Sequence, residues 1–201
     1  MIFTLWSPSV IYVCFQFYRK KYPKEPFRVQ YERAIYSESI LNGLLCTYYG
    51  IFYQDDTIDT IVLSHILSDF FYIYWFRPYD YYMILHHLFT LNYLYTVFFY
   101  FSNPITSLGL GFAETTNVFF NAKLLLKSFH MKIHALDNLF IALFSIARAS
   151  VLPLLTGMEL HRLFWNQWDF VHYNYFCTIL LLHNIGLHFV YKLNVHEKKY
   201  T

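Results

Sequence analysis

The stretch DYYMILHHLFTLNYLY, residues 80–95, places two adjacent histidines, His86 and His87, in the middle of an apolar run. An imidazole is costly to bury in hydrocarbon unless it has a hydrogen-bond partner or faces a wet cavity. Neighbouring positions of an α-helix point about 100° apart, so the two rings cannot play the same role. We therefore expect a helix here, with one histidine facing the centre of an internal cavity and the other facing its wall.

Composition indicates that this helix belongs to a membrane protein. Hydrophobic residues make up 57% of the 201 residues and charged residues only 14%, whereas soluble domains average about 45–50% and about 25%. The chain has 22 Phe and 20 Tyr residues, and Tyr is enriched where a membrane meets water. The three cysteines are odd in number and lack the spacing of metal ligands, so we expect no metal and no bound cofactor.

Seven apolar segments are each close to the roughly 20 residues that a membrane-spanning helix needs. Clusters of turn-forming and charged residues separate them. The predicted fold class is all-α and polytopic transmembrane, with seven helices. The segments are 2–18, 34–53, 58–76, 81–101, 105–126, 136–156 and 170–191.

Basic residues determine the expected orientation. They follow the first segment in the run RKKYPKEPFR, residues 19–28, and loops rich in Lys and Arg stay on the cytosolic side. The N-terminus is therefore expected in the lumen and, after seven segments, the C-terminus in the cytosol. There, Lys198 and Lys199 resemble a dilysine retrieval signal of the endoplasmic reticulum, although an ordinary basic flank after a last helix has the same sequence. The expected location is the endoplasmic-reticulum membrane.

Polar side chains recur inside every segment from the second to the seventh. A charged residue at the centre of a membrane helix costs about 2.5–3.5 kcal/mol on insertion scales and marks a functional site by default. We expect six helices to surround a polar-lined cavity, with the first helix outside it. The alternative is that these groups only pair as hydrogen bonds between helices. The residues are Glu38, Asn42, His65, Asp69, His86, His87, Asn92, Glu114, Asn117, Asn121, Ser145, Arg148, His183, Asn184 and His188.

Arg148 is the one Arg or Lys that falls deep within a predicted segment. A buried guanidinium needs a partner. The sequence predicts an ion pair with Asp69 or Glu114, and with Glu38 as the third candidate. A structural pair and a role in substrate binding are both compatible with its position.

Four stretches together resemble the TLC domain, a membrane family that includes ceramide synthases and lipid-homeostasis proteins. LSDFFYIYW (67–75) places Asp69 in the helix before the histidine pair, and DYYMILHH (80–87) is similar to the family's Asp and His-His signature. ETTNVFFNAKLLL (114–126) is similar to its Glu-x-Ser/Thr-x-x-x-x-Asn stretch, and Arg148 lies in the next helix, as an arginine does in many members. The likeness covers about residues 30–195.

This resemblance implies a barrel of six helices around a lipid-sized tunnel, with one extra helix before it. The implied organisation is a first transmembrane helix and basic cytosolic loop (1–29), the TLC domain (30–195) and a cytosolic tail with the dilysine (196–201). In ceramide synthases the histidine pair is catalytic, which makes His86 and His87 candidate catalytic residues, supported by Asp69 and Glu114. Ceramide synthases also carry a His-Asp-x-x-Asp element where this chain reads GLGFAETTNVFF (109–120), so the resemblance favours the branch outside the ceramide synthases.

The expected function is therefore lipid homeostasis, by binding a lipid or acyl chain in the internal cavity. The alternative is an acyltransferase that uses the histidine pair, with acyl-CoA as co-substrate and a sphingoid or other lipid amine or hydroxyl as acceptor. Membrane lipids are the expected partners, and nothing indicates nucleic-acid binding. Expected lipid-binding residues are Asn92, Asn117, Asn121, Arg148 and His183.

Two other classes share parts of this pattern. Di-iron hydroxylases and desaturases use membrane histidines, but they need about eight in repeated clusters; this chain has one His-His pair, and His130 and His134 of HMKIH fall in a basic loop. A seven-helix receptor would share the helix number, but its usual motifs in the third and seventh helices are absent. We therefore favour the lipid-binding class.

The orientation gives a first testable prediction. Tags placed at the two ends of the chain should differ in accessibility when only the plasma membrane is permeabilised, because seven crossings leave the ends on opposite sides. The C-terminal tag should be labelled and the N-terminal tag protected. Finding both tags on one side would mean that the first segment does not span.

Overall fold

The computed structural model describes residues 5–54, 57–101, 104–131, 133–164 and 169–197. These ranges contain helices and no strand, which confirms the all-α prediction. The α-helices are α1 (Trp6–Lys21), α2 (Phe27–Thr47), α3 (Thr57–Phe76), α4 (Tyr81–Thr96), α5 (Pro104–Ser128), α6 (His134–Ile146), α7 (Leu152–Phe164) and α8 (Phe170–Glu197).

Three π-helical turns extend or join these helices. η2 (Tyr48–Tyr53) follows α2, η3 (Val97–Phe101) follows α4, and η4 (Ala147–Val151) connects α6 directly to α7. The described chain therefore forms seven continuous helical rods, one for each of the seven predicted segments.

Two rods extend well into stretches that the sequence predicted as loops. α2 begins at residue 27 rather than 34, and an ion pair between Arg28 and Glu32 (3.0 Å), one turn apart, lies in its first turns. The α6–η4–α7 rod ends at residue 164 rather than 156, and Arg162 pairs with Glu159 (2.7 Å) in its last turn. Charged residues were taken to end the helices, but pairs at helical spacing stabilise a helix instead.

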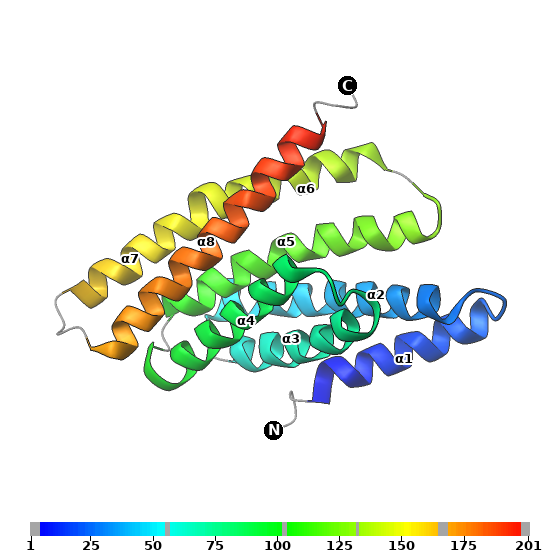
Figure 1. Cartoon of the computed structure of the whole chain (residues 1–201), viewed down its shortest axis with the longest axis horizontal. Coiled ribbons are helices and arrows are strands. Elements are labelled where there is room, and N and C mark those ends of the chain that lie inside the picture. Colours follow the sequence, from blue (N-terminus) through cyan, green and yellow to red (C-terminus); the bar gives the residue numbers. More distant parts are fainter. Residues whose placement is uncertain (1–4, 55–56, 102–103, 132, 165–168, 198–201) are drawn as a thin grey trace.

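Six of the seven rods form a closed ring. α2 packs against α3, α3 against α4, α4 against α8, α8 against α6 and α7, and these against α5, which returns to α2. α1 lies outside this ring against α2 and α3, on the side of the molecule away from α6, α7 and α8 (Figure 1).

The apolar core is divided into three clusters rather than forming one continuous mass. The first joins α1, α2 and α3, the second joins α2, α3, α4 and α5, and the third joins the end of the α4 rod to α7 and α8. Their fully buried members include Ala34, Ile61 and Val97, each 0% exposed. The space between the clusters is left to polar side chains and cavities.

Glycines allow α2 and α5 to approach each other closely. A Cβ atom added at Gly50 would lie 2.7 Å from the Gly111 Cα atom and 2.7 Å from the Ser107 carbonyl oxygen. Both of these are backbone atoms, which cannot move aside as a flexible side chain can. Gly43, about two turns earlier on the same face, has the Glu114 carbonyl oxygen at 2.9 Å from such a Cβ. The α2–α5 contact therefore depends on residues without a side chain.

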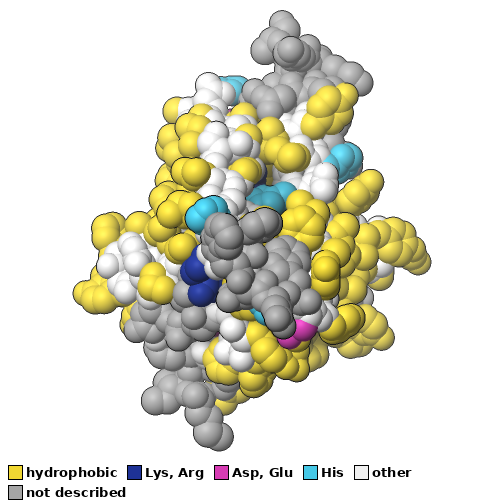
Figure 2. Space-filling model, turned by 90° about the vertical axis from the view of Figure 1, so that its left-hand side faces the viewer, with side chains coloured by type: hydrophobic (Ala, Val, Ile, Leu, Met, Phe, Trp, Pro, Cys, Tyr) yellow, Lys and Arg dark blue, Asp and Glu magenta, His cyan; other side chains and the backbone are white. Residues whose placement is uncertain are grey.

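Besides the apolar clusters, several polar side chains are buried, while many large apolar side chains are exposed. On α3, Trp75 is 71% exposed and Phe71 is 68% exposed, whereas His65 and Ser68 are buried. Because Ile61 and Val62 of the same helix are buried as well, α3 is apolar on its outer side as well as on its inner side, unlike a surface helix of a soluble protein, whose outer face is polar. Hydrophobic side chains also cover much of the end of the molecule seen in Figure 2, apart from the grey residues.

One helix in the described part of the chain is long and apolar enough, by length and composition, to cross a membrane. It is the α6–η4–α7 rod over His134–Leu163.

The glycine contact gives a prediction on stability. Gly50→Ala should lower the free energy of unfolding by about 1–3 kcal/mol, because the new methyl group overlaps backbone atoms of α5. Gly157→Ala is the matched control, since a Cβ at Gly157 meets nothing within 4 Å. The control should be neutral or up to about 1 kcal/mol more stable, because Ala favours helix over Gly. Thermal unfolding followed by circular dichroism compares the two; equal effects would contradict the tight α2–α5 contact.

Candidate functional site

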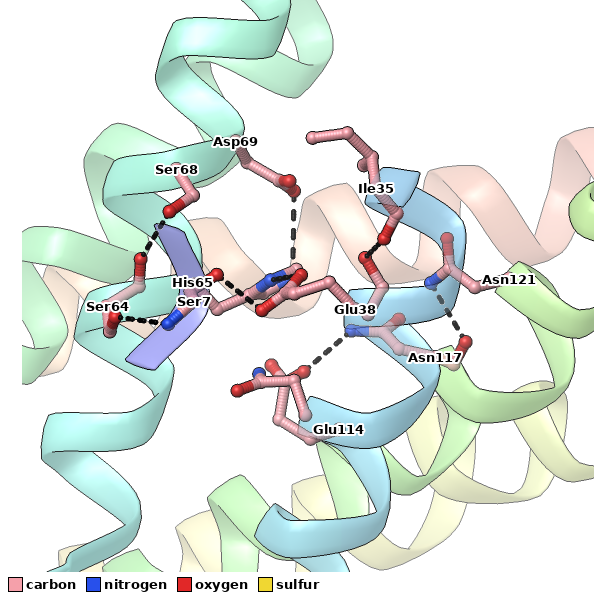
Figure 3. Close-up of polar contacts among 12 residues, drawn as sticks. Ser7, Ile35, Glu38, Ser64, His65, Ser68, Asp69, Glu114, Asn117 and Asn121 are labelled. Atoms are coloured by element: carbon pink, nitrogen blue, oxygen red, sulfur yellow. Dashed lines mark hydrogen bonds and ion pairs between the residues drawn. The ribbon is translucent and has the colours of Figure 1, made fainter. Parts of the chain in front are cut away.

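A fully buried carboxylate, Glu38 of α2, lies at the start of a chain of polar contacts. Its exposed fraction is 0%. The Ser7 hydroxyl of α1 donates a hydrogen bond to one carboxylate oxygen, and the His65 Nδ1 atom of α3 lies 3.0 Å from the other. Figure 3 shows Ser7, Glu38 and His65 converging from three different helices. Glu38 therefore ties α1, α2 and α3 together at a point where no water is needed to satisfy it.

Asp69 continues this chain from α3 to α4. Its Oδ2 atom lies 3.2 Å from His87 Nε2 and 3.6 Å from His65 Nε2, so one carboxylate serves two imidazoles. The other nitrogen of His87, Nδ1, lies 2.8 Å from the Met83 carbonyl oxygen. A carbonyl only accepts hydrogen bonds, so Nδ1 is the nitrogen through which His87 donates to Met83, and Nε2 is the nitrogen that faces Asp69.

His86 has a different environment from His87, as the helical geometry predicted. The two rings are nearly perpendicular, at 85°, with centroids 5.6 Å apart. His87 is buried and held on both nitrogens, whereas His86 Nδ1 makes no hydrogen bond to any residue that the structure describes. His86 faces the interior space of the ring of helices. Its imidazole is thus the one of the pair that is free to meet a ligand.

Two cavities lie inside the ring of helices. The larger, of about 200 Å³, is bounded by α2, α3, α4, α5, α6 and α8, and the smaller, of about 100 Å³, by α4, α5, α7 and α8. The larger cavity reaches Arg77 and Asp80 at the α3–α4 connection, and the smaller one reaches Ile105 at the start of α5. The two cavities share four lining residues: His86, Thr90, Glu114 and Arg148. We call these four residues the waist.

The four predicted catalytic and supporting residues all line the larger cavity. They come from three helices: Asp69 from α3, His86 and His87 from α4, and Glu114 from α5. Glu114 accepts a hydrogen bond from Asn117 Nδ2 (2.9 Å). The structure thus brings these residues to one place, while their chemical roles stay a prediction.

The predicted lipid-binding residues divide between the cavities. Asn117 and Asn121 line the larger cavity, and Arg148 lines both. His183 lines the smaller one, where its Nε2 atom lies 2.7 Å from the Thr156 hydroxyl. Asn121 donates to the Asn117 carbonyl of its own helix (2.9 Å), so its side chain can be changed without breaking a contact between helices.

Asn92 does not fit the predicted lipid-binding role, because it lines neither cavity. Its Nδ2 atom donates to Thr178 Oγ1 (2.6 Å) and to Asn174 Oδ1 (3.2 Å), both on α8. Asn92 follows His86 by six positions, which points it about 120° away from that histidine around α4. Its amide therefore joins α4 to α8, as in the alternative of hydrogen bonds between helices.

Arg148 departs from the sequence prediction in another way. It was expected to form an ion pair with Asp69, Glu114 or Glu38, but within the described ranges no carboxylate oxygen lies within 4 Å of its guanidinium. Asp69 and Glu38 are instead held by the histidines of α3 and α4. The acids were assigned to Arg148 because spacing along a sequence does not show which of several neighbouring helices a side chain faces.

Several contributors to the site were missed from the sequence. Thr90, one turn after His86, is part of the waist, and its position four residues along the helix was a usable signal. Ser7 gave no signal, since a lone serine in an apolar segment is ordinary. The first helix was correctly expected outside the ring, yet Ser7 sends a hydroxyl into the polar chain. The dilysine, Lys198 and Lys199, lies outside the described residues.

The donor set of the site is two carboxylates and two imidazoles that hold one another. In the described part of the chain, no group of three or more His, Cys, Asp or Glu side chains is arranged to hold a metal ion. The arrangement places a fixed imidazole (His87), an imidazole with an unpartnered nitrogen (His86), a guanidinium (Arg148) and an acid (Glu114) around the cavities.

In comparisons with known proteins, the chain matches no family model, no curated protein and no solved structure. The TLC-like motifs therefore stand as a prediction from the residues themselves.

Asp69 gives a prediction on the polar chain. Asp69→Leu should lower the free energy of unfolding by about 1–3 kcal/mol, because both imidazoles lose their shared hydrogen-bond partner. Ser68→Ala, on the same helix, is the control: its hydroxyl bonds only to the Ser64 carbonyl of its own helix. It should change stability by about 1 kcal/mol or less. Denaturant unfolding measures both, and equal losses would show that Asp69 does not organise α3 and α4.

Proposed function

We propose that this chain is a multi-pass protein of the endoplasmic-reticulum membrane that binds a lipid or an acyl chain inside its ring of helices and acts in membrane lipid homeostasis. The observation that carries the proposal is the distribution of side chains. Histidines and acids line a cavity between the helices, while many large aromatic and aliphatic side chains face outward. In water this arrangement exposes apolar surface, but in a bilayer it removes polar groups from hydrocarbon.

The length of the rods supports membrane insertion. A helix rises 1.5 Å per residue, so about 20 residues cross the roughly 30 Å hydrocarbon layer. α3 has 20 residues, α5 has 25 and α8 has 28. Mean hydropathy over a whole helix understates their outer faces, because it averages in the inward histidines and acids and counts Tyr as polar.

The lining of the cavities supports a lipid ligand. Small-molecule sites are mostly apolar, with a few polar groups that fix orientation. Phe120, Phe140 and Ile185 contribute apolar walls to the larger cavity, and the polar groups gather at the waist and along Asp69 and His87. The TLC-like motifs point in the same direction by a separate route, since that family is expected to enclose a lipid between six helices with one more helix outside.

Acyl transfer is the second candidate, and the free imidazole of His86 is the observation that favours it. In that reaction an amine or hydroxyl of the acceptor lipid attacks the thioester carbonyl of acyl-CoA. The new C–N or C–O bond replaces the C–S bond, His86 takes the proton of the nucleophile, and that proton leaves with the CoA thiol. The larger cavity reaches Arg77, on the side predicted to be cytosolic, where acyl-CoA is found.

Lipid carried through purification tests the proposal. Protein extracted in mild detergent should retain a stoichiometric acyl lipid, detected by mass spectrometry of the extracted protein. Asn121→Phe should lower the bound lipid at least about threefold, because a new ring occupies the larger cavity. Asn121→Ala, which removes the same amide without filling space, should lose less lipid than Asn121→Phe, so that the difference between the two measures the effect of filling the cavity.

The same preparations separate binding from catalysis. If the protein is a transferase, wild type supplied with acyl-CoA and a sphingoid amine should release free CoA thiol, and His86→Ala should not. Bound lipid without thiol release supports a binding protein. If wild type carries no bound lipid, and Asn121→Phe is as stable as wild type, the cavity holds no lipid and the proposed function is wrong.

A further inference from the structure

Arg148 is a charged side chain that the structure encloses without giving it a partner. It lies in the π-helical turn η4, between α6 and α7. The Arg148 Nε atom is buried and has no hydrogen-bond acceptor among the described residues, and no ion pair joins its guanidinium to any of them. The remainder of its surface faces the two cavities at the waist. Its guanidinium therefore faces the cavities without an ion-paired acid or a hydrogen-bond acceptor among the described residues.

The side chain is held in this position by packing. The guanidinium carbon lies 5.4 Å from the centre of the Phe144 ring, one turn earlier on the same rod. The aliphatic part passes Gly186 of α8, where an added Cβ atom would lie 3.2 Å from Arg148 Cδ. A larger residue than glycine would press on the stem of the arginine. The ring and the glycine orient the side chain, but neither neutralises it.

The acids that line the cavities are already engaged. Asp69 is held by two imidazoles, and Asp80 accepts the backbone N–H of Met83 at the start of α4. Glu159 accepts two hydrogen bonds from Arg162. Glu114 shares the waist with Arg148 but lies beyond ion-pair distance from it and accepts from Asn117 instead. An unpaired guanidinium in a low-dielectric interior is costly, and an incoming anion removes that cost.

We propose that Arg148 binds the anionic head of a single-chain amphiphile, a ligand with one acyl or alkyl chain and a carboxylate or phosphate group. This inference rests on the proposed function and names its ligand class. A guanidinium can form two parallel hydrogen bonds to such a head. Thr90 and the unpaired nitrogen of His86 border the same space and supply further polar contacts.

The sizes and linings of the cavities favour one chain over two. Together they approach only the lower end of the roughly 300–1,000 Å³ range of small-molecule sites. The smaller cavity continues from the waist between α4, α5, α7 and α8, and six aliphatic side chains contribute to its wall. They are Ile105, Leu110, Leu152, Leu155, Ile179 and Leu182. The larger cavity opens from the same waist and has Phe120, Phe140 and Ile185 in its wall, so we place the head of the ligand at Arg148 and its chain through both cavities.

Three probes with the same 16-carbon chain test this inference on the purified protein: hexadecanoate, hexadecyl phosphate and hexadecanol. The first measurement compares the equilibrium dissociation constants of the three probes for the wild-type protein. At least one anionic probe should bind about tenfold or more tightly than the alcohol, as a charge-assisted hydrogen bond implies. Preference for hexadecanoate assigns a carboxylate head, and preference for hexadecyl phosphate assigns a phosphate head.

Variants then assign the preference to this residue. Arg148→Met keeps the length and removes the charge, so it should weaken the anionic probe at least about tenfold and leave hexadecanol within about threefold. Arg148→Lys should retain part of the preference. If Arg148→Met does not fold, Gly186→Ala should lower the anionic preference by displacing the arginine.

The possible failures are distinguishable. If wild type binds all three probes equally, the anion site is wrong while the lipid cavity stands. An anionic preference that survives in both Arg148→Met and Gly186→Ala would also overturn the site. If wild type binds none of the probes, the proposed function fails and this inference fails with it.

Discussion

One carboxylate, that of Asp69, holds two histidines on two helices, and the interior of this protein is organised around that contact. His65 approaches it along α3 and His87 approaches it from α4, while Glu38 anchors the far side of His65. Acids and imidazoles therefore alternate along one line, and each group has a partner of the opposite kind. Such an arrangement stabilises the fold only when every member is present, because a half-satisfied polar network in a low-dielectric interior is worse than none. The apolar clusters pack around this line instead of filling it.

Most acids and imidazoles of this line already bond to one another, so few polar groups are left to contact a ligand. His87 is held on both of its nitrogens and Asp69 is held through Oδ2, whereas Asp69 Oδ1 has no hydrogen-bond partner among the described residues. His86 and Arg148 are the groups with unsatisfied nitrogens that face the cavities. His87 and Asp69 are held in position by each other, and His86 and Arg148 next to them are available to a ligand. This is the geometry of a binding site with a rigid supporting frame.

Much of the helix pattern could be predicted from the sequence, because apolar runs of about 20 residues separated by charge clusters are a strong signal. The sequence also placed His86 and His87 in different environments, since that follows from helical geometry alone. It could not assign partners. Asp69, Glu114 and Glu38 were all plausible partners for Arg148, and the choice depends on how each rod is rotated in the ring, which no local pattern records. The predicted lipid-binding role of Asn92 met the same difficulty. Its residue type suits a cavity, but its side chain points from α4 toward α8. Helix ends were misplaced where ion pairs such as Arg28–Glu32 extend a helix through charged residues.

The π-helical turn η4 has a consequence for how one rod serves two cavities. An α-helix advances 100° per residue, so a stripe of side chains spaced every three or four positions slowly drifts around the rod. Phe144, Arg148 and Glu159 all face the interior of the ring although they span four turns. A π-helical turn holds one residue more than an α-helical turn, which rotates the following side chains back toward the interior. The inward-facing stripe of α6 therefore continues in α7. The α6–η4–α7 rod therefore forms one continuous wall of both cavities. Arg148 lies in the π-helical turn, where the part of the rod that lines the larger cavity meets the part that lines the smaller one.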